Sequence, residues 1–177
     1  RRRTKRLMRE TVDRTGITRW RFTRSLGRAA GAPGVSHHVL IAPPGAGNIG
    51  DQAMVEAFVA AADRPVTLIT RFPDDFSLPP DLAESAVVTP LPHLLYGQGT
   101  EHRRDIRRLG GVLDGAATVS IIGADIMDGV YSLRPSLRRS SLATATASAG
   151  FDTTVIGFSW NGAAPRPAWA ALRAAGE

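Results

Sequence analysis

The sequence contains no cysteine and only one lysine, Lys5. Without cysteine, the chain forms no disulfide bond, offers no thiolate to a metal ion and has no cysteine nucleophile. No apolar run approaches the roughly 18 residues of a membrane-spanning helix, and no apolar segment follows the arginine-rich start to make a signal peptide. These absences exclude cysteine-dependent enzymes and favour a cytoplasmic protein.

Metal ligands of other kinds are also scarce. The pair Asp125 and Asp128 offers two carboxylates, which are too few ligands for a divalent cation without further oxygen donors. The histidines have no spacing that is typical of a metal site; they are His37, His38, His93 and His102. We therefore expect no metal ion and no other cofactor.

Positive charge is concentrated at the start of the chain. Residues 1–28 contain 11 basic and 2 acidic side chains, whereas residues 29–177 contain 11 basic and 14 acidic ones. A glycine- and proline-containing linker, GAPG, ends at Gly34. We therefore predict a basic N-terminal arm and linker over residues 1–34 and a mildly acidic domain over residues 35–177.

The arm combines its arginines with apolar side chains, among them Trp20 and Phe22. A partly helical extension that packs a few apolar groups on the domain is the favoured interpretation. The alternative is contact with an anionic membrane surface, worth about 1 kcal/mol per basic residue, which would place the protein at the inner face of the membrane. Because no nucleic-acid recognition motif accompanies the arm, we expect no nucleic-acid partner.

Beyond the linker, short apolar runs alternate with helix-like segments. Strands are expected at residues 38–42, 65–70, 86–89, 117–122 and 153–158. Helices are expected at residues 51–62, 101–113 and 136–149, and a last one opens at Pro167. Such alternation is typical of a parallel sheet covered by helices on both faces. The predicted fold is a doubly wound, Rossmann-like α/β domain, in which ligands bind at the carboxyl ends of the strands.

The stretch from Gly45 to Gly50 reads GAGNIG and fits the dinucleotide-binding pattern G-x-G-x-x-G. However, two prolines at 43–44 separate it from the preceding strand, and Asp51 would put a carboxylate where a pyrophosphate should bind. The second predicted strand ends in Thr70 and Arg71 instead of an acid that could bind a ribose. These features disfavour a dinucleotide.

Three predicted strand-end loops, at residues 43–51, 123–129 and 159–165, combine glycine with polar side chains. The sequences GAGNIGDQAMVEAF, VSIIGADIMDGVYS, LRRSSLATATASAG and TTVIGFSWN together resemble the N-terminal half of the polysaccharide pyruvyl transferase family, over about residues 37–177. The matching positions are Gly47, Asn48, Gly50, Asp51 and Ala53, then Gly123, Asp125 and Asp128, then Gly157, Ser159 and Asn161.

This resemblance implies one half of a two-domain, GT-B-like enzyme. Members of the family transfer the enolpyruvyl unit of phosphoenolpyruvate to a sugar hydroxyl and form a pyruvate ketal on a cell-surface polysaccharide. The resemblance further implies that a second domain supplies much of the phosphoenolpyruvate site. On this interpretation the chain holds the saccharide-acceptor half and is inactive alone.

The candidate site residues lie in these three loops. Asp125 and Asp128 are the candidate catalytic residues, because a carboxylate accepts a hydrogen bond from a sugar hydroxyl and can take its proton. A capping or solvated role is the alternative for both, and Asp51 is expected to cap the first predicted helix. The residues expected to contact substrate are Gly45, Gly47, Asn48, Gly50, Asp51, Gly123, Tyr131, Ser159, Trp160 and Asn161.

Three arginines near the helix at 136–149 have two interpretations. Arg134, Arg138 and Arg139 could meet a phosphate, but a solvated helix face is the favoured prediction. Two other functions also stay open. One is a GT-B sugar-nucleotide glycosyltransferase, and the other is a non-catalytic module that binds a sugar or a phosphate.

Overall fold

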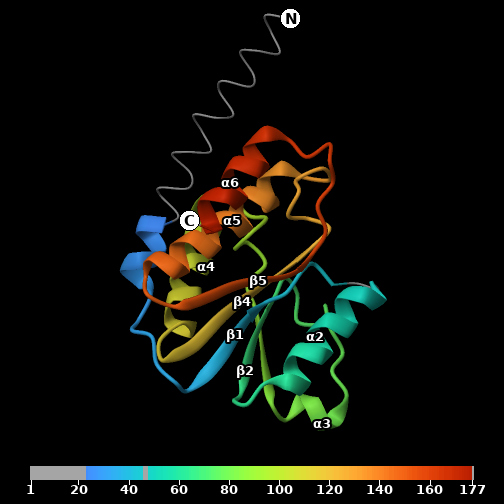
Figure 1. Cartoon of the computed structure of the whole chain (residues 1–177). Coiled ribbons are helices and arrows are strands. Elements are labelled where there is room, and N and C mark those ends of the chain that lie inside the picture. The colour runs from blue at the N-terminus through green and yellow to red at the C-terminus, as the bar shows by residue number, and fades with distance from the viewer. Residues whose placement is uncertain (1–22, 46–47, 177) are drawn as a thin grey trace, which may run out of the picture.

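The computed structural model describes residues 23–45 and 48–176 (Figure 1). Residues 23–29 are helical. The elements that follow are β1 (His37–Ile41), α2 (Ile49–Ala61), β2 (Val66–Thr70), α3 (Pro80–Ala83), β3 (Ala86–Pro90), α4 (Gly99–Val112), β4 (Ala116–Ala124), α5 (Leu133–Ser148), β5 (Asp152–Phe158) and α6 (Arg166–Gly176).

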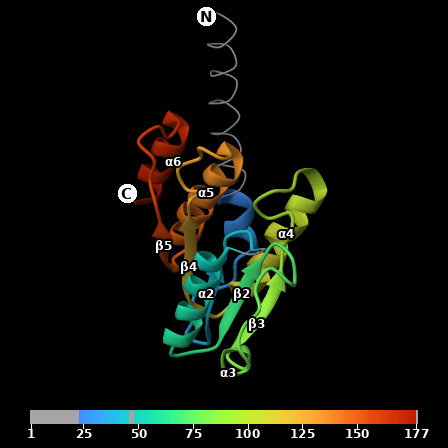
Figure 2. The ribbon, with the colours of Figure 1, turned by 90° about the vertical axis from the view of Figure 1, so that its right-hand side faces the viewer.

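The five strands form one parallel sheet in the order β3-β2-β1-β4-β5. Figure 2 shows β3 near one edge of this sheet and β5 near the other. The predicted α/β, Rossmann-like fold with a parallel sheet is therefore confirmed. The strand order reverses between β1 and β4, so the carboxyl ends of these two strands flank the topological switch point, where open α/β sheets bind ligands.

Helices cover both faces of the sheet (Figure 1). On one face, Val55 and Val59 of α2 pack with Leu40 and Leu68 of the strands. The other face holds the larger apolar cluster, to which α4 and α5 contribute, and α6 packs on α5. Full burial of each such aliphatic side chain stabilises the fold by about 1.5–3 kcal/mol.

The helix α5 differs from an ordinary surface helix because the sheet lies on one side of it and α6 on the other. Ten of its sixteen residues are buried, and most of these are serine, threonine or alanine. Small side chains permit close packing on two sides at once. The helix starts at Leu133, three residues before the predicted start, and Pro135 falls within its first turn, where a missing N–H is tolerated.

Part of the predicted arm packs against the domain. Leu26 is fully buried in the larger apolar cluster. Gly34 donates its backbone N–H to the Ala116 carbonyl oxygen at 2.9 Å, and Gly115 donates to Ala32 at the same distance. The remainder of the arm, including Trp20 and Phe22, lies outside the described residues. No helix in the described part of the chain is long and apolar enough to cross a membrane.

Candidate functional site

The predicted site residues follow β1, β4 and β5 at the carboxyl edge of the sheet. The loops after β4 and β5 are joined by a hydrogen bond from the Ser159 backbone N–H to the Ala124 carbonyl oxygen, at 3.1 Å. Gly45 lies against Asp75, so close that a Cβ atom there would overlap the Asp75 carbonyl. Gly47 lies outside the described residues.

The loop after β1 is closed by Asn48, which caps α2. Its Oδ1 accepts the backbone N–H groups of Gly50 and Asp51 at 3.0 and 3.4 Å, and its Nδ2 donates to Asp51 Oδ2 at 2.9 Å. The cap is therefore Asn48 and not, as expected, Asp51. An asparagine cap of this kind is worth about 1 kcal/mol, and here it also orients the Asp51 carboxyl group.

Asp51 is 6% exposed and is influenced by the charge of Asp125, one of the two candidate catalytic residues. Burial raises the pKa of Asp51, and the negative charge of Asp125 raises it further. The Arg139 guanidinium and the hydrogen bond from Asn48 act in the opposite direction on this pKa. The loops after β1 and β4 thus bring one buried and one exposed carboxyl group into electrostatic contact, an arrangement suited to holding and passing a proton.

The strand β4 ends with a strained residue. Ala124 has a φ of 48°, in the left-handed region that disfavours side chains, and such strain costs about 1–3 kcal/mol. Directly after it, Asp125 is exposed to solvent. Asp128 is buried instead, and its Oδ1 accepts the Val130 N–H at 2.9 Å, while Tyr131 is exposed. Asp128 thus caps the turn that leads to Tyr131, and capping was the predicted alternative to a catalytic role.

Gly123 allows the ends of β4 and β5 to approach each other closely. A Cβ atom at this position would lie 2.5 Å from Phe158 Cβ and 2.6 Å from Met127 Cγ. Any side chain here would push these neighbours away. Gly123 therefore shapes the site through packing, and its predicted contact with substrate stays a prediction.

The loop after β5 leads to an aromatic hollow. Trp160 meets Trp169 of α6 edge to face, with the ring centroids 6.4 Å apart. Both rings border a hollow of about 330 Å³, which is otherwise lined by Phe158, Leu172 and Arg173. The Asn161 side chain accepts the Ala163 N–H at 2.9 Å.

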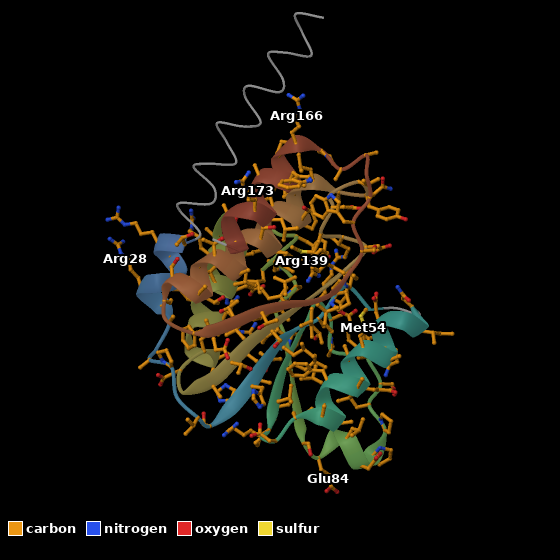
Figure 3. All side chains as sticks on the ribbon, viewed as in Figure 1. Arg28, Met54, Glu84, Arg139, Arg166 and Arg173 are labelled. Atoms are coloured by element: carbon orange, nitrogen blue, oxygen red, sulfur yellow. The ribbon has the colours of Figure 1, made fainter. Side chains whose placement is uncertain are left out.

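Two arginines that were expected on a solvated helix face are buried, and that prediction is wrong. Arg139 is 0% exposed and lies between α5 and the sheet (Figure 3). Its Nη1 donates to the Ile122 carbonyl oxygen at 3.0 Å and its Nη2 to that of Ala42 at 3.2 Å. Since Ala42 follows β1 and Ile122 lies in β4, Arg139 joins the two strands that flank the switch point.

Arg138 fixes the segment between β3 and α4. Its Nη1 donates to the carbonyl oxygens of Leu95 and Gly97 at 2.9 and 2.7 Å. Burial lowers the pKa of Arg138 to about 10, so the group remains charged at neutral pH. Of the three arginines considered, only Arg134 is exposed.

Three further residues without a predicted substrate role lie at the end of β2 and in the segment between β3 and α4. The Arg71 guanidinium lies 4.9 Å from the centre of the Phe72 ring and 4.6 Å from that of Tyr96. Thr70, Arg71 and Tyr96 all line a small cavity beside the switch point. A strand ending in Thr-Arg was the only sequence signal for this cluster, because Tyr96 comes from a distant loop.

Within the described residues, no group of three or more histidine or acidic side chains could hold a metal ion. His38 lies at the start of β1, away from the carboxyl edge, where it bonds Thr118 and Asp63 at 2.8 Å each. Comparisons with protein-family models, curated proteins and solved structures gave no match to this chain.

Proposed function

We propose that this domain is one half of a polysaccharide pyruvyl transferase-like enzyme with a two-domain, GT-B-like plan. The enzyme would transfer the enolpyruvyl group of phosphoenolpyruvate to a sugar hydroxyl during cell-surface polysaccharide biosynthesis. The observation that supports this most directly is the buried carboxyl group of Asp51 in the first turn of α2, whose pKa is raised by burial and by the charge of Asp125. The motif resemblance of the loops around them supplies the reaction class.

The proposed reaction needs one proton to be delivered and others to be removed. Protonation of the methylene carbon of phosphoenolpyruvate makes the neighbouring carbon electrophilic. A sugar hydroxyl then attacks this carbon and loses its proton, phosphate departs, and a second hydroxyl of the sugar closes the ketal. The net products are the ketal and inorganic phosphate.

Asp125 and Asp51 suit different steps of this reaction. Asp125 is exposed and can accept the proton of an attacking hydroxyl. Asp51 is buried and has a raised pKa, so it can carry the proton to be delivered. Tyr131, Ser159 and Trp160 would contact the saccharide, and arginines would stabilise the departing phosphate.

The location that we propose follows from the same reaction. The saccharide acceptor would then be at the inner face of the membrane, and the basic arm would hold the protein near that anionic surface. This part of the proposal rests on the charge of residues 1–28.

The test is an assay of the complete gene product with phosphoenolpyruvate and a panel of saccharides, with phosphate release and ketal formation as readouts. Replacing Asp125→Asn should lower kcat by about 100-fold or more, as expected for loss of a general base. Glu84→Gln is the control, because Glu84 is exposed beside α3, at the opposite end of the molecule (Figure 3). The absence of both phosphate release and ketal would contradict the proposal.

The same assay distinguishes the two other candidate functions. Turnover of a sugar nucleotide with release of a nucleoside diphosphate would indicate a GT-B glycosyltransferase. Saccharide or phosphate binding without any turnover would indicate a non-catalytic binding module.

A further inference from the structure

The ends of β1 and β2 and the segment after β3 enclose a small cavity, whose lining is mostly apolar. It measures about 10 Å³, which is room for about one water molecule or one ligand oxygen atom. Its polar side chains are those of Thr70, Arg71 and Tyr96. The cavity is too small for a sugar ring.

Two polar atoms around this cavity lack hydrogen-bond partners among the described residues. These atoms are Thr70 Oγ1 and Arg71 Nε, and both are buried; the Tyr96 hydroxyl, also buried, lies beside the Arg139 guanidinium. Thr70 as a whole is only 3% exposed. Buried polar groups in native proteins are almost always hydrogen-bonded, so two unpartnered ones around one cavity indicate a missing partner there.

The surroundings of the cavity are positively charged. The Arg71 guanidinium forms no ion pair in the part of the chain that the structure describes, although the Arg71 backbone N–H donates to Asp75 Oδ2 at 2.8 Å. Behind the cavity, Arg139 donates to the carbonyl of Ala42, which is itself a lining residue, and interacts with the Tyr96 hydroxyl. Arg139 Nε also has no hydrogen-bond partner there.

The charge of these arginines is only partly balanced. The one carboxylate that acts on Arg139 is that of Asp51, and Arg138 contacts carbonyl oxygens next to the cavity. Buried cations are normally paired with a negative charge, because removing a lone charge from water is costly. An anion at the cavity would supply that charge.

We propose that this cavity is an oxyanion subsite, which accepts one oxygen of a phosphate or carboxylate group. The hydroxyls of Thr70 and Tyr96 donate hydrogen bonds to this oxygen, while Arg71 and Arg139 supply the compensating charge. The rest of the ligand lies outside, towards the switch point. The subsite requires no transfer chemistry and goes beyond the proposed function.

Titration calorimetry with inorganic phosphate, and separately with acetate, tests the proposal and distinguishes the two anion sources. Both anions are compared with chloride at equal ionic strength. Thr70→Val removes the hydroxyl at nearly constant volume and should weaken phosphate or acetate binding by about tenfold or more. Arg71→Gln should weaken it further, whereas Arg107→Gln, an exposed arginine on α4, should leave it unchanged.

Thermal unfolding supplies a readout that does not depend on activity. Without anion, Thr70→Val should have a higher Tm than the wild-type protein, because it removes a buried hydroxyl without a partner. Phosphate or acetate should raise the Tm of the wild type, since a ligand of the folded state stabilises it, and at the same concentration should raise that of the variant by less.

Saturable binding of neither phosphate nor acetate, or equal binding by the wild type and Thr70→Val, would overturn the subsite. Anion binding without ketal formation would leave the subsite intact and contradict only the proposed transferase. Ketal formation by the wild type, together with normal anion binding by the Thr70→Val variant, would support the transferase and contradict the subsite.

Discussion

The two halves of the carboxyl edge are built in contrasting ways. On the side of β1 and β2, Arg71 and Arg139 are held by rings and carbonyl oxygens, and the polar groups around them are buried. On the side of β4 and β5, the carboxylate of Asp125 and the rings of Phe158 and Trp169 are exposed. The first side is buried within the fold, whereas the second presents side chains to solvent.

Removing the buried cation should break this contrast most severely. Arg139→Ala loses hydrogen bonds to both strands at the switch point and leaves a cavity, so we expect the free energy of unfolding to fall by about 3 kcal/mol. Arg134→Ala, five residues earlier and exposed on the same helix, should change it by less than about 0.5 kcal/mol. Urea unfolding of both variants measures the difference, and equal midpoints would contradict it.

A smaller effect should come from the other side of the edge. Gly123→Ala places a methyl group against Phe158 and Met127, and overpacking of this kind costs about 1–3 kcal/mol. Gly162→Ala is the matched control, because a Cβ atom there meets nothing within 4 Å. Thermal unfolding should show a lower Tm for the first variant only. An unchanged Tm for Gly123→Ala would mean that the β4 and β5 ends are not tightly packed.

The smallest effect concerns Asp51, which lies between the two sides. Its folded-state pKa is raised above 3.8, so the folded protein binds this proton more tightly than the unfolded chain does. The wild type should therefore lose stability as the pH rises from 3.8 through the raised pKa, and Asp51→Asn should not. Urea unfolding at several pH values up to about 7 tests this. A difference between the two proteins that is constant with pH would contradict it.

The parallel sheet could be predicted because its strands are short, apolar on both faces and separated by helices. Parallel strands end at the same edge of the sheet, so the loops after β1 and β4, which carry Asp51 and Asp125, could also be placed at that edge from the sequence. The prediction of the residue that caps α2 was wrong. Asn48 takes the role expected of Asp51, because the loop turns so that the asparagine side chain reaches the free N–H groups.

The buried arginines could not be predicted from the sequence. Helical periodicity separates one buried face from one exposed face, but α5 is covered on two sides, so Arg138 and Arg139 are buried with its small residues. The contact of Arg139 with Ala42 joins positions 97 residues apart. The cavity also depends on residues that are distant in the sequence, because Tyr96 contacts Arg71 from the segment after β3. Such pairs depend on tertiary packing, which local sequence patterns do not record.

The buried position of Leu26 bears on how this protein should be produced in the laboratory. A recombinant version cut at the predicted domain start, Val35, would lack this side chain and leave uncovered the apolar cluster that includes Leu109. The helix at residues 23–29 belongs in any expressed version, even one that omits the basic residues before it. Deletions meant to remove the charged arm should therefore stop before Thr23.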